Sequence, residues 1–398
     1  MQNNNTLTAE TPNLTDITAD NFTQAYRHFV EQGDFIALTR QFEQGFVQTG
    51  ADNQLSFKVK QAKVSLLDTG VLLIEPENVE PELIKEKSAT PSKSIVISSG
   101  IHGNETAPIE IVQQLISDII AQKIQVKHRT LLIMGNPVSM NIEKRFQTEN
   151  LNRLFCGKYQ DIDPCFEKYR AEKLEGYVSD FFNAGTATNA TDNTSGNTCE
   201  SQVTNSSKMT NYHYDLHTAI RNSKYEKFAI YPYQAGKPWD KEQLSFMASC
   251  GVNTILFGHG PSGTFSYFSS ANFSAHAFTI ELGKVRPFGE NNMENFQAMT
   301  NNLSALISDE AIPLESFDNN DFNLFEALGD ITKVSDKFEL FVADEASNFT
   351  DYPVGTLLST DMNQEYRTTL PGESIVFPNA NVGNGQRAVL MVVPTTLQ

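Results

Sequence analysis

The chain is poor in cysteine and tryptophan, and it contains no long apolar run. It has four cysteines and one tryptophan in 398 residues, and no two cysteines form a C-x-x-C pair. Four thiols spread over this length do not build a disulfide framework, which favours a reducing compartment. No apolar run approaches the roughly 20 residues that cross a bilayer. The polar start, MQNNNTLTAETPNLTD, lacks the features of a secretory signal, so we expect a cytoplasmic protein without membrane association.

Positive charge is also scarce. The chain has 30 Lys and Arg against 48 Asp and Glu, which gives a formal net charge of -18 at pH 7. Such a chain repels polyanions at long range, so nucleic acid is not expected as a partner. A small anionic ligand would need local cations to overcome this background. Individually placed arginines are therefore informative in this sequence.

The first three quarters of the chain predict an α/β fold. SIVISSG (Ser94–Gly100) is a β-branched run typical of a strand buried on both faces, and an apolar helical pattern follows HGNET. The next strand is predicted at TLLIMGNP (Thr130–Pro137), which completes a β-α-β unit whose ligands bind beyond the carboxyl ends of the strands. Further elements are expected in the ranges Asn21–Gly45 (helical), Leu55–Glu75, Phe228–Pro232, Asn253–Gly258 and Ala277–Gly283 (strands).

Two later segments have a different character. More than half of residues 185–210 are Ser, Thr or Asn, which predicts a flexible surface insertion. From about Pro313 onward, short β runs alternate with Gly, Pro, Asn and Asp. We therefore expect a mixed sheet flanked by helices over residues 1–312 and a smaller β domain over residues 313–398.

Three motifs carry residues suited to metal chemistry: GIHGNETAP (Gly100–Pro108), YDLHTAIR (Tyr214–Arg221) and FTIELGK (Phe278–Lys284). His102 and Glu105 are spaced i, i+3 at the mouth of the predicted helix, and His217 supplies a third donor. Two imidazoles and one carboxylate are a common donor set for catalytic Zn²⁺, with a further position open. The alternative is that His102 occupies a glycine-rich turn and that Glu105 is stabilised by the helix dipole.

Glu281 and Asp215 are carboxylates close to this set. The apolar residues that precede Glu281 in the predicted strand place it where little water reaches it. Such an environment raises the pKa of a carboxyl group and suits a proton shuttle. Glu281 could equally be an ordinary carboxylate at a strand end. Asp215 shares a face with His217 if the chain there is extended. The remaining histidines have no donor at ligand spacing and are interpreted as structural or surface residues, with His213 the nearest to His217.

Cations concentrate in KRFQTENLNRLF (Lys144–Phe155), which contains Lys144, Arg145 and Arg153, with Asn152 next to Arg153. A planar guanidinium pairs bidentately with a carboxylate, so this segment predicts a clamp for an acidic substrate. The alternative is a solvated loop whose cations pair with surface acids.

In combination, these motifs resemble those of one family. GIHGNETAPIE, GNPVSM, NLNRLF, HYDLHTAIR, TIELGKVRPFG and PGESIVFPNANVGNGQRA occur here in the order found in the succinylglutamate desuccinylase branch of the aspartoacylase family, which is related to the zinc carboxypeptidases. The resemblance extends from about residue 20 to the C-terminus and omits the insertion at 185–210.

The resemblance implies a zinc-carboxypeptidase-like fold and hydrolysis of N-succinyl-L-glutamate to succinate and L-glutamate, the last step of arginine catabolism by the succinyltransferase route. It also implies a promoted-water mechanism with one Zn²⁺ per chain. The implied roles are metal ligation by His102, Glu105 and His217, general base and acid catalysis by Glu281, carbonyl polarisation by Arg145, and binding of a substrate carboxylate by Asn152 and Arg153.

Other activities fit the same residues. An N-acetylaspartate-type acyl-amino-acid deacylase would act on a substrate with two carboxylates, whereas succinylglutamate has three, and Arg221 is a candidate partner for the additional one. A zinc carboxypeptidase would use the same donors. A non-catalytic binding protein on a decayed hydrolase scaffold is disfavoured because the three ligands and Glu281 are all present. These patterns do not define an oligomeric state.

Overall fold

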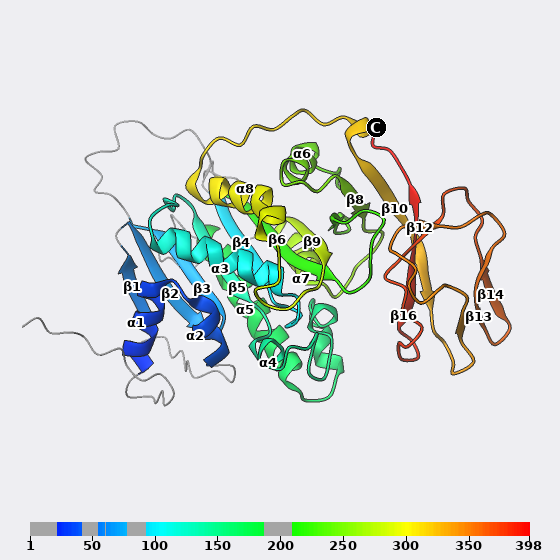
Figure 1. Ribbon diagram of the computed structural model, residues 1–398, viewed down its shortest axis with the longest axis horizontal. Coiled ribbons are helices and arrows are strands. Elements are labelled where there is room, and N and C mark those ends of the chain that lie inside the picture. The colour runs from blue at the N-terminus through cyan, green and yellow to red at the C-terminus, as the bar shows by residue number, and fades with distance from the viewer. Residues whose placement is uncertain (1–21, 42–54, 60, 78–92, 187–208) are drawn as a thin grey trace, which may run out of the picture.

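The computed structural model of the chain describes residues 22–41, 55–59, 61–77, 93–186 and 209–398. It shows a large mixed sheet with helices on both faces and a group of C-terminal strands at one end (Figure 1). The helices are α1 (Phe22–Gln32), α2 (Phe35–Gln41), α3 (Thr106–Ile120), α4 (Pro137–Asn141), α5 (Phe166–Thr186), α6 (Lys241–Ser249), α7 (Phe265–Phe273) and α8 (Gln297–Ser308). The predicted insertion lies outside the described residues except at its ends.

The strands in chain order are β1 (Leu55–Val59), β2 (Ala62–Asp68), β3 (Val71–Pro76), β4 (Lys93–Ser99), β5 (Arg129–Met134), β6 (Thr210–Ala219), β7 (Phe228–Tyr231), β8 (Thr254–Phe257), β9 (His276–Lys284), β10 (Asn323–Thr332), β11 (Glu339–Leu340), β12 (Thr350–Asp351), β13 (Leu357–Asp361), β14 (Gln364–Arg367), β15 (Ser374–Val376) and β16 (Arg387–Pro394). One sheet has the order β1-β2-β3-β5-β4-β6-β9-β7-β8-β10-β16-β15-β12, and a second has the order β11-β13-β14. The predicted class, a mixed sheet flanked by helices with a smaller C-terminal β part, is confirmed.

The helices form two layers because neighbouring side chains of the central strands face opposite ways. In β4, Ile95 and Ile97 belong to the larger apolar core, which the side chains of α1, α2, α3, α6 and α8 complete. Val96 faces the other core, which is formed with α5 and α7. Such two-sided burial explains the continuous apolar runs of the central strands. Among the described helices, none combines the length and apolarity needed to span a membrane.

The order of the central strands defines where a ligand can bind. β4 pairs in parallel with β5 on one side and with β6 on the other, and β6 pairs in parallel with β9. The chain leaves β4 toward β5 through α3, as predicted, and reaches β6 on the opposite side only later. This reversal is a topological switch point, where α/β sheets open a crevice beyond the strand ends.

The C-terminal strands extend the same sheet. β10 pairs in parallel with β8 and antiparallel with β16, so hydrogen bonds run continuously from the central strands into the C-terminal part. The sequence predicted short strands after Pro313 but not β10, because apolar and polar residues do not alternate regularly in NLFEALGDIT, although burial in the folded chain alternates from Glu326 onward. The small sheet of β11, β13 and β14 is antiparallel throughout. The domain boundary near residue 312 stays a prediction.

Candidate metal centre and active site

The turn after β4 brings His102 and Glu105 to the switch point. Gly103 permits this turn because a Cβ there would lie 2.1 Å from the backbone carbon of Ser139, near the start of α4. Glu105 is the residue before α3, but its side chain forms no capping hydrogen bond with the helix. The carboxylate is buried and points toward the histidines. Contacts with the two histidines, and not capping of the helix, therefore orient this carboxylate.

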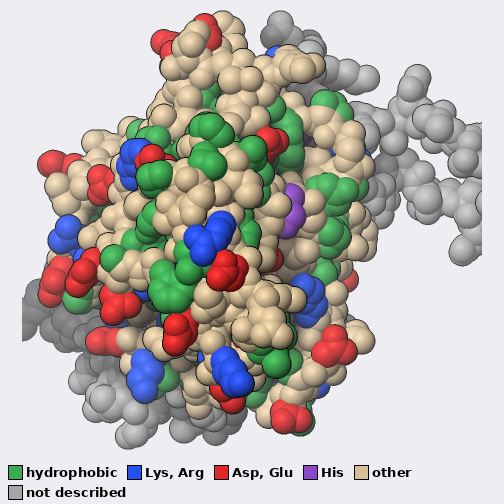
Figure 2. Space-filling model, turned by 90° about the vertical axis from the view of Figure 1, so that its right-hand side faces the viewer, with side chains coloured by type: hydrophobic (Ala, Val, Ile, Leu, Met, Phe, Trp, Pro, Cys, Tyr) green, Lys and Arg blue, Asp and Glu red, His purple; other side chains and the backbone are tan. Residues whose placement is uncertain are grey.

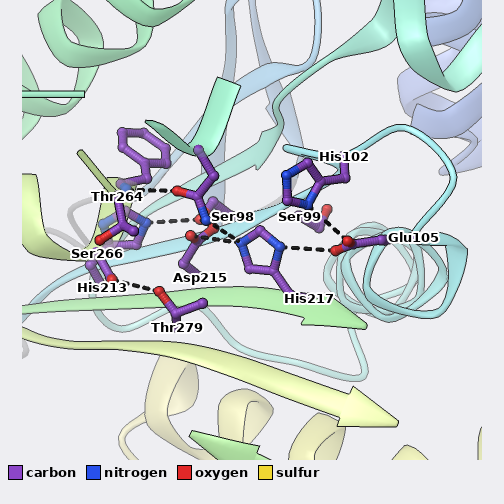
Figure 3. A network of polar contacts seen from close by, with 12 residues as sticks. Ser98, Ser99, His102, Glu105, His213, Asp215, His217, Thr264, Ser266 and Thr279 are labelled. Carbon is purple, nitrogen blue, oxygen red and sulfur yellow. Dashed lines mark hydrogen bonds and ion pairs between the residues drawn. The ribbon is translucent and has the colours of Figure 1, made fainter. Parts of the chain in front are cut away.

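Three donors converge on one point. Glu105 Oε1 lies 2.8 Å from His102 Nδ1, and Glu105 Oε2 lies 2.9 Å from His217 Nδ1. Each of the three residues offers one ligand atom, and these atoms all lie within 4.8 Å of one another. All three side chains are buried. In Figure 3, His217 lies between Asp215 and Glu105, and His102 lies above the Glu105 carboxylate. The structure thus brings together the three predicted ligands.

The second nitrogen of each imidazole is held by an oxygen acceptor. His102 Nε2 lies 2.9 Å from Asn150 Oδ1, and His217 Nε2 lies 2.9 Å from Asp215 Oδ2. An acceptor at Nε2 favours the tautomer that carries its proton there, which leaves the Nδ1 lone pair for a metal. Both Nδ1 atoms face Glu105, so the donor set fits a metal ion. The prediction that Asp215 shares a face with His217 is confirmed.

The electrostatics of these groups favour a cation between them. Burial and the charge of Arg145 lower the pKa of His102 to about 4. Burial also opposes protonation of His217, but the carboxylates of Asp215 and Glu105 hold its pKa well above the usual value. Burial raises the pKa of Glu105, yet the charges of His102, Arg145 and His217 together hold it well below the usual value. In the metal-free protein, the proton on His217 and the guanidinium of Arg145 supply positive charge beside these carboxylates, and a divalent cation would take the place of that proton.

Behind His217 lies a buried polar chain that includes His213. Ser98 Oγ donates to Asp215 Oδ1 at 2.6 Å and lies 2.8 Å from His213 Nε2, whose ring is also 2.7 Å from Ser269 Oγ through Nδ1. Burial lowers the pKa of His213 to about 4, so this imidazole is neutral. The alternation of His213, Asp215 and His217 along an extended strand was a sequence signal for this shared face.

Glu281 lies on β9 directly across from His217 on β6. Burial, followed by the charge of Glu105, raises its pKa to about 7. Among the described residues, Glu281 Oε2 is a buried atom with no hydrogen-bond partner. A carboxyl group with a free oxygen and a pKa near neutrality can both accept and return a proton. The expected dry setting is therefore present, whereas the catalytic role stays a prediction.

The segment Lys144–Phe155 lies beside the donor set. Arg145 Nη1 forms an ion pair with Glu105 Oε1 at 2.5 Å and is 30% exposed. Asn152 is buried, with Nδ2 3.3 Å from His217 Nε2 and Oδ1 accepting from the backbone amide of Phe265. Arg153 follows in the short 3-10 helix η2 (Leu151–Arg153), and its guanidinium donates to the carbonyl of Asn152. The structure brings Arg145, Asn152 and Arg153 to the centre, and their roles toward a substrate stay predictions.

Two anchoring residues of this segment were not identified from the sequence. The buried carboxylate of Glu167 on α5 accepts from the backbone amide of Gln147 at 2.8 Å, which fixes the chain between Arg145 and Asn150. Asn150 itself accepts from the amide of Asn152 at 3.2 Å as well as contacting His102. The side chain of Asn150 therefore ties a metal ligand to the predicted clamp.

Arg221 is not part of this group. Its guanidinium donates to the backbone carbonyl of Asp344, after β11. The main charges that act on the pKa values of His102, Glu105 and Glu281 do not include Arg221. Its expected role toward a substrate carboxylate stays a prediction that these contacts do not support.

Replacing Asn150 with alanine is expected to weaken Zn²⁺ binding by about 10- to 100-fold, because the His102 ring loses the acceptor that fixes its orientation and tautomer. Competition with a chromogenic chelator would measure the affinity. Asn211→Ala is the matched control, since this asparagine donates to the carbonyl of Phe273 instead. Equal zinc affinities for Asn150→Ala and wild type would contradict this role.

Comparison with known proteins identifies the family. The sequence profile of the succinylglutamate desuccinylase/aspartoacylase catalytic domain matches residues 91–192 and 184–307, and that of the AstE/AspA barrel-sandwich hybrid domain matches residues 320–395. The chain belongs to the succinylglutamate desuccinylase/aspartoacylase family. The matched catalytic domain contains every predicted site residue, from His102 to Glu281.

Individual relatives agree with this assignment. The chain is 43% identical to a succinylglutamate desuccinylase of Pseudoalteromonas atlantica over 93% of this chain and 97% of that one, and 42% identical to one of Shewanella denitrificans over 92% and 97%. A crystal structure of the succinylglutamate desuccinylase of Chromobacterium violaceum superposes with a TM-score of 0.72 at 31% identity, covering 92% of this chain and 98% of that one.

Proposed function

We propose that this protein is a zinc-dependent hydrolase that splits N-succinyl-L-glutamate into succinate and L-glutamate. The observation that carries the proposal is the convergence of His102, Glu105 and His217 in a buried site faced by Glu281. The names of relatives that match nearly the whole chain support the choice of substrate. The reaction would be the last step of arginine catabolism by the succinyltransferase route, in the cytoplasm.

The residues divide the chemistry between them. His102, Glu105 and His217 would hold one Zn²⁺, which when bound supplies a Lewis acid that polarises a carbonyl and acidifies water. Glu281 accepts a proton from the attacking water and returns it to the departing amine of glutamate, as its pKa of about 7 permits. Arg145 donates to the acyl carbonyl oxygen as negative charge develops on it.

Asn152 and Arg153 bind a carboxylate of the substrate. Asn152 is fixed by Phe265 on one side and lies against His217 on the other, so any group that it orients is close to the donor set. Arg153 extends the same turn and supplies positive charge within a chain of net charge -18. An anionic substrate is therefore drawn to this turn rather than to the surface at large.

A side-by-side assay tests the activity and the substrate. We expect the zinc-loaded protein to release succinate from N-succinyl-L-glutamate with a kcat/KM about 100-fold above that for N-acetyl-L-aspartate, because loss of a charged hydrogen bond removes roughly 1.5–3 kcal/mol. A chelator should abolish turnover, and added Zn²⁺ should restore it. Equal rates on the two substrates would refute the preference, and turnover that survives complete zinc removal would refute the metal dependence.

A further inference from the structure

The buried polar chain behind His217 consists of five side chains that lead from helix α7 to the predicted metal centre: Ser269, His213, Ser98, Asp215 and His217. All five are buried. Figure 3 shows four of them in succession, from His213 through Ser98 and Asp215 to His217. Because solvent does not reach these groups, each of them depends on a hydrogen-bond partner within the protein.

The sheet places the polar chain on one face. Since β6 is extended, His213, Asp215 and His217 at positions i, i+2 and i+4 point to the same side. In the parallel pairing of β4 with β6, Ser98 lies opposite Asp215. Helix α7 covers this side and brings Ser269 Oγ to 2.7 Å from His213 Nδ1. The position of every member therefore follows from strand register and helix packing.

The hydrogen bonds of the polar chain have a defined direction. Ser98 Oγ donates its proton to Asp215 Oδ1 at 2.6 Å, so the same oxygen can only accept from His213 Nε2, which lies at 2.8 Å. Burial keeps the His213 ring neutral by lowering its pKa to about 4, so Nδ1 has no proton and accepts from the hydroxyl of Ser269. At the other end, Asp215 Oδ2 lies 2.9 Å from His217 Nε2. The donor–acceptor sense thus leads from α7 to Asp215.

Aromatic contacts fix the plane of the His213 ring. It packs edge-on against Phe265, with 4.7 Å between the ring centroids, and Phe265 stacks on Phe155 at 4.2 Å. These contacts keep Nε2 aimed at Ser98. A phenylalanine at position 213 would retain the ring and its packing but lose both hydrogen bonds, which makes it an informative substitution.

Exposed polar contacts of the same protein differ from the polar chain. Acidic and basic side chains are interspersed on the face that the C-terminal strands form (Figure 2), as in the pair of Arg367 Nε and Glu365 Oε2 at 2.9 Å. Water competes for such contacts, and each contributes little. Buried hydrogen bonds in series polarise one another instead, so the loss of one is transmitted to the next.

We propose that His213 is a positioning residue of the metal centre. Through Ser98 it fixes the carboxylate of Asp215, which in turn holds the ring of His217 with Nδ1 turned toward the other donors. The inference rests on the metal site of the proposed function. It adds to the residues that determine zinc affinity a histidine that lies two hydrogen bonds beyond Asp215.

Zinc affinity, measured by competition with a chromogenic chelator, tests the proposal. His213→Phe should weaken Zn²⁺ binding about 3- to 10-fold, because the buried hydrogen bond to Ser98 is lost. His213→Gln should stay within about twofold of wild type, since its side-chain amide can donate to Ser98 Oγ in place of the ring nitrogen. Equal losses in the two variants would mean that only the ring matters and would overturn the proposal, as would wild-type affinity in His213→Phe.

The matched control is His276→Phe, on the neighbouring strand β9. This histidine is 28% exposed and stacks on Tyr212 at 5.4 Å, beside the larger apolar core on the opposite face of the sheet. The same substitution there should leave zinc affinity within about twofold of wild type, because no hydrogen bond of the polar chain is removed. A loss equal to that of His213→Phe would overturn the proposal.

A double-mutant cycle shows whether His213 acts through Ser98. Ser98→Ala should weaken zinc binding about 10-fold, because Asp215 loses the hydroxyl that orients it. Adding His213→Phe to this variant should cause little further loss, since the polar chain is already interrupted. Losses that multiply in the double variant would show that the two residues act independently, and the proposal would fail.

A measurement on the zinc-loaded wild type needs no variant to fold. The ¹⁵N chemical shifts of an imidazole report which nitrogen carries the proton, and we expect His213 to be neutral and protonated at Nε2. The opposite tautomer in a protein that binds zinc would overturn the inference alone, whereas a wild type that binds no zinc would overturn the proposed function as well. Neither zinc affinity nor tautomer depends on hydrolysis of succinylglutamate.

Discussion

Replacing Glu281 with glutamine is expected to lower kcat by about 10²- to 10⁴-fold while zinc content stays near one per chain. The amide keeps the size of the carboxylate but cannot accept a proton from water, and general acid–base catalysis contributes a factor of this order. Glu281 is not one of the three converging donors, so metal binding should persist. Succinate release and metal analysis on the same preparation measure both quantities.

The control for this variant is Glu326→Gln, which changes an exposed glutamate within strand β10. It should retain wild-type turnover.

Thermal or denaturant unfolding supplies a second check, because the pKa of Glu281 is raised in the folded state to about 7. The folded metal-free protein then holds a proton that the unfolded chain has released, so the stability contributed by this group falls as pH rises from about 4.5 to 7. Glu281→Gln should lack that decline. If Glu281→Gln keeps wild-type turnover, the catalytic role of Glu281 is refuted.

Replacing Glu105 with glutamine is expected to remove the metal. Its two carboxylate oxygens are shared between His102 Nδ1 and His217 Nδ1, and the negative charge offsets Arg145. An amide at this position leaves the positive charge of Arg145 without a counter-charge beside a divalent cation, and the amide oxygen is a weaker metal ligand than a carboxylate oxygen. We expect zinc to fall from near one to below about 0.1 per chain after dialysis, with turnover lost in parallel.

The matched control for Glu105→Gln lies within α3, the helix that follows Glu105. Glu110 accepts from the backbone amide of Gly289 at 2.7 Å and from Asn291, away from the donor set. Glu110→Gln should therefore keep one zinc per chain. Metal analysis that finds stoichiometric zinc in Glu105→Gln would exclude this carboxylate as a ligand.

Predictions from the sequence were most accurate where a local pattern of helix or strand and the chemistry of the side chains point to the same site. The β-branched run at Ser94–Gly100 and the helical pattern after it placed His102 and Glu105 at a strand end, where the structure has them. Extended alternation placed Asp215 beside His217. Both pairs of residues lie within four positions of each other in the sequence. The local conformation of a strand end or of an extended strand, together with the residue types, therefore determines which side chains meet.

Contacts between distant segments were harder to predict. The sequence makes Arg221 a candidate partner for a substrate carboxylate because it lies four residues from His217; that role stays a prediction, and its guanidinium donates to the carbonyl of Asp344. Likewise, Arg387 Nη1 lies 3.6 Å from Asp330 Oδ1 because β16 pairs with β10. No local spacing encodes such an approach, since it depends on strand register across the whole sheet.

The continuity of that sheet also protects the protein from self-association. Without β10, the backbone amides and carbonyls of β8 (Thr254–Phe257) would form an open edge; all four residues are buried, and three of them are apolar. Exposed edges of this kind recruit strands from other chains. The sheet instead ends in β12, two residues long and containing Asp351, which offers little for another chain to pair with. The C-terminal strands are therefore also an edge cover for the catalytic sheet.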